Sequence, residues 1–367
     1  MKARFTLDGS AELERRLEDL CDVIADAVRS LIPRNRLEGL VLAGGYGRGE
    51  GGVLKLEDGA DAPYNDLEFF VFVRGNPTLN SRRFSQVLHE LGERLSPEAG
   101  VDVEFKVESL ASLRTARPSM FFYDLVMGHR WIIGDDSMFA GCEHHRDAAA
   151  IPLHEATRLL FNRSSGLLFA QERLSGDTFG EEDADFVGRN LAKAKLALGD
   201  VLLAAGGNYH WSCRERHTAL VSMDVPPWAE RLKAWHAEGV EFKLHPQRSR
   251  AGAAQLREEW RAVTEVAGRL FLEVESRRLR TDFATHGDYL HHRGNLAPEV
   301  PRWKRALLDL RHFGLVGGWR HRYPREALLR ALTALLWLRD AKAAAGVLGC
   351  AVKDVQATYA RLWSRFN

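Results

Sequence analysis

Two acidic side chains stand one residue apart in an apolar segment of this chain, shortly after a turn rich in glycine. The turn reads GGYGRGE from residue 44 to residue 50, and the acids are Asp66 and Glu68. Side chains alternate along a β-strand, so both carboxylates face one side of it, and Leu67, Phe69 and Val71 face the other. Neighbouring carboxylates repel each other unless a cation lies between them, and Mg²⁺ is commonly held by one or two carboxylates together with substrate phosphates. The pattern therefore predicts transfer of a nucleotide.

The elements around this pattern predict a small α/β domain with a short mixed sheet. An amphipathic helix over residues 11–32 begins after Ser10, which is a suitable N-cap. The remaining elements, in chain order, are a strand over 39–43, a loop over 53–63, a strand over 67–73, a helix over 81–95 and a strand over 101–107. The last strand alternates cleanly and places Asp102 and Glu104 on one face.

The character of the chain changes near residue 150, after which every strong pattern is helical. Helical periodicity covers residues 153–174, 184–205, 228–238, 251–279, 301–312 and 323–345. We therefore predict an α+β protein, with a mixed-sheet catalytic domain over 1–145 followed by an all-α domain over 146–367 that selects the acceptor.

Composition is that of an ordinary globular protein that does not cross a membrane. The chain has 367 residues, 45% of them hydrophobic, and a net charge of +1, so no global field draws it to nucleic acid or to lipid. Its four cysteines form no Cys-x-x-Cys pair and its start has no apolar signal sequence. We expect a cytoplasmic protein with reduced thiols.

The glycine turn followed by the acid pair resembles the signature of the DNA polymerase β-like nucleotidyltransferase superfamily. The turn is most similar to that of PII-protein uridylyltransferases, and the resemblance covers roughly residues 38–110. It implies a small mixed sheet that carries three carboxylates, two divalent metal ions and a nucleoside triphosphate, ATP among the possible substrates. The ions would be Mg²⁺, with Mn²⁺ as the alternative.

The resemblance assigns roles to particular residues. Asp66 and Glu68 would be the paired metal ligands, and the third carboxylate would be Asp102 or Glu104 on the next strand, with Asp102 preferred as the metal ligand. The residues that would meet the triphosphate are Gly44, Gly45, Tyr46, Gly47, Arg48 and Lys193. Lys193 is included because a lysine on the helical domain reaches the triphosphate in several such enzymes.

Two features depart from the family pattern. The spacer between turn and acids carries an insertion around residues 54–62, and the second acid is Glu68 where aspartate is commoner. The chain also lacks a His-Asp doublet and has no room for the hydrolase and ligand-sensing domains of the PII-modifying enzymes. The identity of the acceptor therefore does not carry over from the resemblance.

The chemistry requires these residue types. Transfer of a nucleoside monophosphate to a hydroxyl builds negative charge at the attacking and leaving oxygens, and two metal ions about 4 Å apart stabilise both. The third carboxylate would also draw the proton from the acceptor hydroxyl. Glycines allow backbone amides to approach phosphate oxygens, and Arg48 can add charge-assisted hydrogen bonds.

Three other functions compete with this hypothesis. The glycines at 47, 49 and 52 formally match a dinucleotide-binding fingerprint, but the following residues 53–63 are too short for its crossover helix. The second competing function is a catalytically silent sensor or scaffold, which would bind a nucleotide at the same glycine turn.

The third competing function is a toxin-like enzyme that modifies tRNA. Its only support is a basic region with interspersed tryptophans: Arg277, Arg278, Arg280, Arg302, Trp303, Lys304, Arg305, Arg311, Trp319, Arg320, Arg322 and Arg325. A small molecule or a protein is therefore the preferred acceptor over RNA.

Overall fold

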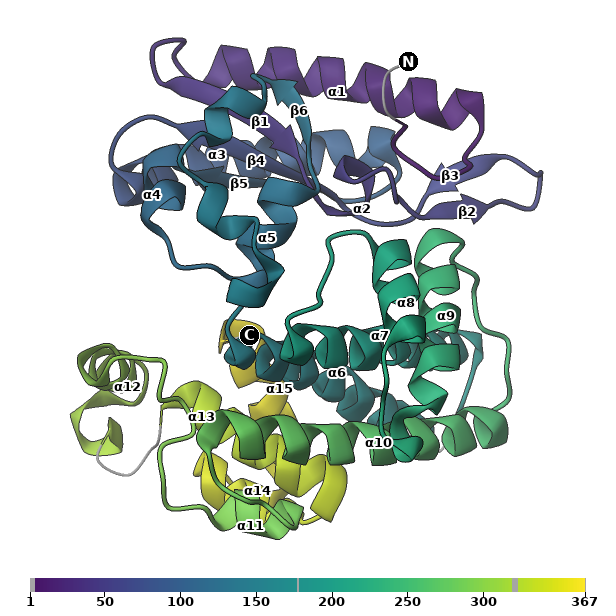
Figure 1. Ribbon diagram of the computed structural model, residues 1–367, viewed down its shortest axis with the longest axis vertical. Helices are drawn as coiled ribbons and strands as arrows, with labels where there is room; N and C mark the ends of the chain where they lie inside the picture. Colours follow the sequence, from purple (N-terminus) through teal and green to yellow (C-terminus); the bar gives the residue numbers. More distant parts are fainter. Residues whose placement is uncertain (1–3, 177, 319–322, 367) are drawn as a thin grey trace. The chain divides into compact units, whose positions relative to one another are not determined.

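The computed structural model describes residues 4–176, 178–318 and 323–366 (Figure 1). The chain forms two compact units. The first contains residues 1–152, 206–224 and 237–247, and the second contains residues 153–205, 225–236 and 248–367. The first unit is therefore not a single stretch of chain: it runs on to residue 152 and takes in two later segments, all within the region where the sequence places the helical domain.

The first unit is built on a mixed four-stranded sheet in the order β5-β4-β1-β6 (Figure 1). Its strands are β1 (Leu37–Leu42), β4 (Leu67–Val73), β5 (Val103–Glu108) and β6 (Arg130–Ile133). Strand β1 runs antiparallel to both β4 and β6, and β4 runs parallel to β5. The end of β1 thus meets the beginnings of β4 and β5 at one end of the sheet.

Each face of this sheet packs against a different set of helices. Leu67, Phe69 and Val71 point to one face and form a core with α1 (Ala11–Leu31) and α3 (Pro77–Ala99). Alternate residues of β4 pack against α4 (Leu110–Thr115) and α5 (Met120–Met127) on the other face. The alternation predicted for β4 is confirmed.

Local sequence signals place the ends of the long helices. The Ser10 side chain accepts a hydrogen bond from the Leu13 amide and caps α1 as predicted. Asn76 caps α3 in the same way, and Gly100 ends that helix in the left-handed conformation, with φ at 77°.

The spacer between turn and acids is a two-stranded ribbon and not the predicted loop. Strands β2 (Val53–Lys55) and β3 (Asp61–Pro63) pair antiparallel. The turn between them places Gly59 at φ +83°, which glycine adopts without strain. Runs of three residues are too short to give a periodic signal, which is why the sequence did not reveal them.

Two helices complete the first unit from later in the chain. They are α8 (Cys213–Ser222) and the second part of α9 (Arg231–Leu244).

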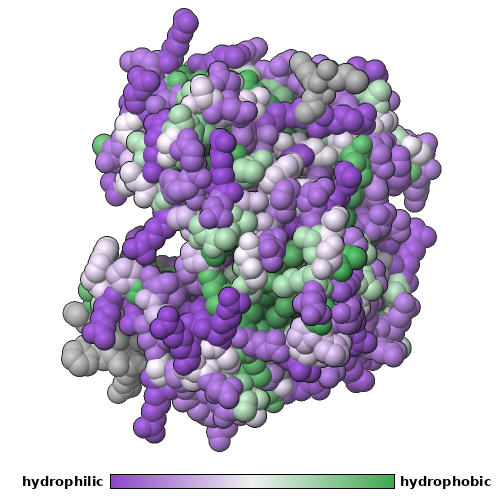
Figure 2. All heavy atoms as spheres, viewed as in Figure 1, coloured by the Kyte–Doolittle hydropathy of each residue, from purple (hydrophilic) through white to green (hydrophobic). Residues whose placement is uncertain are grey.

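The described part of the second unit is helical. Its long helices are α6 (Leu153–Leu174), α7 (Glu181–Gly206), α10 (Ala253–Leu279) and α12 (Arg302–Gly318), and its shorter ones are α11 (His286–His291), α13 (Pro324–Leu332), α14 (Ala341–Leu348) and α15 (Val355–Phe366). Most of the face shown in Figure 2 is hydrophilic, and hydrophobic residues reach this surface in patches between hydrophilic ones.

The helix predicted over 323–345 is interrupted. After α13 the backbone forms a π-helical turn over Thr333–Leu338, and Arg339 then takes a left-handed conformation at φ 54° before α14 begins. Every residue from Glu326 to Leu336 is buried, so the apolar pattern does not reveal where the α-helix gives way to the π-helical turn.

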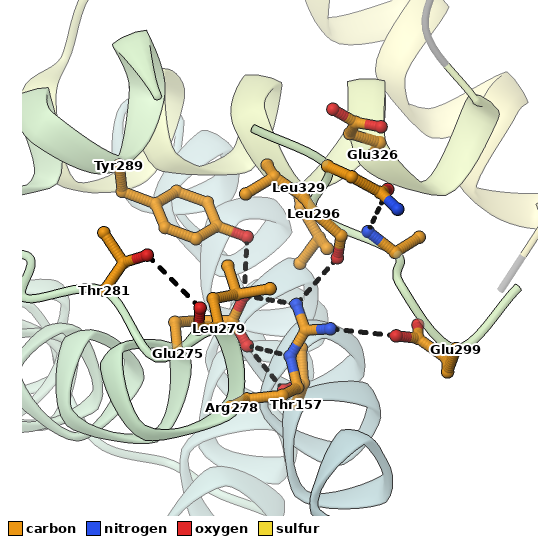
Figure 3. Close-up of polar contacts among 12 residues, drawn as sticks. Thr157, Glu275, Arg278, Leu279, Thr281, Tyr289, Leu296, Glu299, Glu326 and Leu329 are labelled. Carbon is orange, nitrogen blue, oxygen red and sulfur yellow. Dashed lines mark hydrogen bonds and ion pairs between the residues drawn. The ribbon is translucent and has the colours of Figure 1, made fainter. Parts of the chain in front are cut away.

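A buried polar network lies in the second unit (Figure 3). Glu275 on α10 is fully buried and accepts hydrogen bonds from the hydroxyls of Thr157 and Tyr289 and from the guanidinium of Arg278. Arg278 also binds the Glu299 carboxylate at 3.0 Å.

The coarse fold prediction is confirmed: the protein is mixed α and β, with a small mixed sheet in its N-terminal part. No helix within the described ranges is both long and apolar enough to span a bilayer.

Candidate functional site

The glycine turn is a single turn of helix, α2 (Gly44–Gly47), that begins directly after β1. Gly44 has φ +63°, a conformation that favours glycine. A side chain at Gly47 would place its Cβ 2.2 Å from the Leu42 carbonyl oxygen, so only glycine fits there. These two positions let the chain reverse tightly at the end of the sheet.

Tyr46 holds the turn from within the core. Its ring is fully buried, and its hydroxyl donates to the Gly52 carbonyl at 2.8 Å and accepts from the Tyr64 amide at 2.9 Å. Burial raises the pKa of the phenol to about 12, so the hydroxyl remains protonated. Of Tyr46, only the backbone can meet a ligand.

Within the described residues, the first three amides of the turn, those of Gly44, Gly45 and Tyr46, donate no backbone hydrogen bond, and Tyr46 is buried. The amides of Gly47 and Gly49 donate to carbonyls within the turn, so they do not point forward as the sequence suggested. Gly44 and Gly45 are partly exposed, and their amides donate no backbone hydrogen bond in the described part of the chain. A phosphate cradle at this turn would therefore use these two amides.

The acids of β4 and β5 form a row on one face of the sheet. Glu68 and Glu104 are paired residues of the two parallel strands, and neighbouring strands lie about 4.8 Å apart. Asp102 stands beside the start of β4, because its carbonyl oxygen accepts the Leu67 amide at 2.8 Å. Asp66, Asp102 and Glu104 are exposed and Glu68 is half-buried.

Glu68 lies beside the turn. A Cβ built on Gly44 would lie 3.7 Å from the Glu68 carboxylate, so turn and acid are in direct contact. Glu104, on the far side of the row, has a cation of its own: the Lys106 ammonium is 3.9 Å from its carboxylate and lies over the Phe70 ring. Glu68 and Asp102 make no side-chain hydrogen bond or ion pair within the described residues.

The row suits a magnesium site in its chemistry and in its backbone placement. Carboxylate oxygens are the ligands that Mg²⁺ prefers; Glu68 and Glu104 are neighbours on two adjacent strands, and Asp66 and Asp102 directly precede these strands. Their side chains do not converge: among described residues no three His, Cys, Asp or Glu side chains form a ready metal site. Binding would require exposed carboxylates to rotate toward one another, and the choice between Asp102 and Glu104 stays open.

Arg48 lies away from the acids and inside the first unit. Its guanidinium donates to the Asp124 carboxylate at 3.0 Å and to the Trp211 carbonyl oxygen at 3.3 Å. Burial lowers the pKa of Arg48, but the charges of Asp124, Tyr209 and Glu50 together outweigh it, so the pKa of the guanidinium lies above its usual value. The side chain thus links the turn to the segment before α8.

Glu50, the last residue of the motif, has a structural role that sequence reasoning missed. Its buried carboxylate accepts hydrogen bonds from the Ser212 hydroxyl and the Cys213 amide at the start of α8. Burial raises the pKa of Glu50, but these bonds and the charge of Lys243 outweigh it, so the pKa lies below its usual value.

Lys243 on α9 is the second residue that the sequence did not identify. Its carbonyl oxygen packs against Gly52, where an added Cβ would lie 2.9 Å from it, so this lysine belongs to the surroundings of the turn. Burial and the neighbouring charge of Arg48 lower the pKa of its ammonium to about 8. No hydrogen bond or ion pair of this ammonium is formed within the described part of the chain.

Lys193, the lysine that the resemblance assigned to the triphosphate, lies on α7 in the second unit. The lysine near the glycine turn is instead Lys243 of the first unit. No motif marks it, because almost 200 residues separate it from Gly44. Only its place on a helix that returns to the turn reveals it.

Of the basic region proposed to bind RNA, Trp319, Arg320 and Arg322 lie outside the described residues. Arg278 and Arg305 are engaged with acids of the second unit, Arg278 in the network around Glu275 and Arg305 with Glu326 at 3.9 Å. No protein-family model matches this chain, and no curated protein matches it significantly.

Proposed function

We propose that this protein is a Mg²⁺-dependent nucleotidyltransferase that moves a nucleoside monophosphate from a nucleoside triphosphate to an acceptor hydroxyl, with release of pyrophosphate. One observation carries the proposal: the open amides of Gly44 and Gly45, the Glu68 carboxylate and the acids at the start of β5 lie at the same end of one sheet. Phosphate donors and metal ligands are thus adjacent.

Each group then has a defined task. Asp66 and Glu68 would hold both metal ions, and Asp102 or Glu104 would complete the set and accept the proton of the acceptor hydroxyl. The ions, when bound, supply positive charge at the attacking and leaving oxygens. The amides of Gly44 and Gly45 would orient the pyrophosphate end of the nucleotide, and Lys243 would add a positive charge there.

A second candidate function has an observation of its own. The acids do not converge within the described residues, and Lys106 lies 3.9 Å from the Glu104 carboxylate, an arrangement compatible with a module that binds a nucleotide without reacting. Such a sensor would bind Mg²⁺–triphosphate and release no pyrophosphate.

One experiment separates the two functions. The protein is incubated with Mg²⁺, each of the four labelled triphosphates and cell extract, and pyrophosphate and the labelled product are followed together. Transfer that disappears in Asp66→Asn supports the enzyme. Saturable triphosphate binding without pyrophosphate in the wild type supports the sensor, and the absence of both refutes the nucleotide site.

A further inference from the structure

The outward side of α12 in the second unit is apolar. Trp303, Leu307 and Leu310, the apolar stripe, are 69%, 57% and 46% exposed. Their spacing of four and three residues places them on one side of the helix. None of residues 302–311 is buried, whereas the helices α6, α7 and α10 of the same unit each bury many of their residues.

The polar side of α12 faces the rest of the unit instead. The Arg305 guanidinium donates to the Asn295 side chain and pairs with the Glu326 carboxylate at 3.9 Å. Asp309, one turn later, has a carboxylate oxygen that is buried. A helix on the surface of a globular protein normally turns its apolar face to the core, so α12 is oriented the opposite way. Its apolar stripe is therefore available to a partner.

Cations border the apolar stripe on both sides. Successive residues of an α-helix are about 100° apart, so Arg302 lies on one flank of the stripe, and Lys304 and Arg311 lie on the other. All three cations are exposed, and none forms an ion pair within the described residues. The sequence of α12 contains one acid, Asp309, and it lies on the inner side. The outward side thus combines hydrophobic residues with charge of a single sign.

This combination of groups distinguishes the possible occupants. A second copy of the chain that paired through the same stripe would bring the cations of both copies together. A nucleic acid would pair with the cations but would leave the apolar stripe in water. The surface of a protein usually carries both signs of charge, which flanks of a single sign do not match. An anionic lipid surface fits both features, because its phosphates attract Lys and Arg while Trp and Leu enter the boundary between headgroups and acyl chains.

We propose that α12 docks the protein on membranes that contain anionic lipid. The apolar stripe lies at the boundary between headgroups and acyl chains, and the three cations lie among the lipid phosphates. Neither attraction is strong alone, because three side chains bury little apolar area and each cation adds little free energy, so the contact is reversible and needs both. The net charge of +1 does not oppose it, because charges act on the lipid only within about 8 Å at physiological salt.

The test is co-sedimentation of the full chain with two kinds of vesicle, one of phosphatidylcholine alone and one that also contains about 30% phosphatidylserine. We expect the protein to bind the anionic vesicles about tenfold or more tightly than the neutral ones, because only the former attract the three cations. High salt should release the protein from the anionic vesicles, because it screens these charges.

Two pairs of variants locate the contact on α12. Trp303→Ser should weaken binding about tenfold or more, whereas Leu79→Ser, at a leucine of the first unit that is 61% exposed, should not. Lys304→Gln should weaken binding about fivefold, whereas Lys353→Gln, at another exposed lysine of the second unit, should not. All four positions are exposed, so the melting temperatures should hardly change.

Membrane docking and the proposed transfer reaction can fail independently. Asp66→Asn, which removes a proposed metal ligand, should bind anionic vesicles as tightly as the wild type. Absence of binding, equal binding to neutral vesicles, or binding that survives Trp303→Ser would overturn the proposal. A dimer in lipid-free solution that Leu307→Glu dissociates would also overturn it, because the apolar stripe would then belong to a second copy of the chain.

Discussion

Carboxylates in the two units have opposite surroundings. In the second unit, Glu275 is fully buried and four donor groups surround it: two hydroxyls and two nitrogens of Arg278. In the first unit, Glu68 and Asp102 have no such partner among described residues, although like charges stand beside them on the neighbouring strand. A buried carboxylate that accepts hydrogen bonds from several donors stabilises the fold. A row of carboxylates without such donors costs free energy through mutual repulsion unless a cation binds between them.

The largest effect on stability should follow the loss of Glu275. Glu275→Ala leaves Arg278 buried with only Glu299 as a charged partner, and we expect the free energy of unfolding to fall by about 3–5 kcal/mol. Glu68→Gln should cost nothing or stabilise slightly, because it relieves repulsion within the row. Denaturant unfolding of both variants measures the contrast, and equal losses would show that the two groups of acids are equivalent.

The acid row should be the part that matters for activity. Asp66→Asn should reduce nucleotidyl transfer about 100- to 1,000-fold, because a group that would stabilise the transition state is lost, while the exposed position should limit the change in melting temperature. Glu57→Gln, an exposed acid in the ribbon between β2 and β3, is the matched control and should retain full activity. Transfer that survives Asp66→Asn would remove the row from the mechanism.

Lys243 extends the comparison to cations, because its ammonium, like the Glu68 carboxylate, makes no hydrogen bond or ion pair within the described residues. Lys243→Met should raise the KM for the triphosphate about tenfold, as expected for a lost charge-assisted hydrogen bond. The ammonium is charged only below its pKa of about 8, so in the wild type the KM should rise as the pH increases through 8. Lys243→Arg should abolish this pH dependence. A KM that is flat from pH 7 to pH 9 in the wild type would contradict the assignment.

The smallest effect should follow the substitution of Glu50, a carboxylate of the first unit that accepts hydrogen bonds from neighbouring groups. Glu50→Gln should lower the free energy of unfolding at pH 7 by about 1–2 kcal/mol, because the hydrogen bonds from Ser212 and Cys213 lose their charge. The pKa of Glu50 is lowered by folding, so its contribution is complete above its ordinary value of 4.5 and is lost as the pH falls below that. Unfolding curves of wild type and variant should therefore converge in acid.

Sequence reasoning succeeded where a pattern is local. Alternation in β4 was enough to place Asp66 and Glu68 opposite a core face of Leu67, Phe69 and Val71, and the Ser10 cap and the long helices followed from periodicity. These features depend on neighbours within one or two turns of chain.

Sequence reasoning failed where contacts join segments that are far apart in the chain. Nothing near Glu50 in the sequence indicates that Ser212 and Cys213 will bind it, and nothing near residue 243 marks a lysine beside the glycine turn. The interruption at Arg339 was hidden for a different reason: apolar residues of high helix propensity lie before and after it, so the sequence pattern does not register a change of backbone path.

The discontinuous first unit has a consequence for how the protein is made. The strands of the sheet are synthesised early, but Trp211, which binds Arg48, and Ser212 and Cys213, which bind Glu50, follow much later, and Lys243 later still. Until then the glycine turn lacks its supports, and a truncated product ending at Pro152 would expose a buried glutamate and arginine to solvent. The first unit is therefore complete only after residues 206–224 and 237–247 have been synthesised.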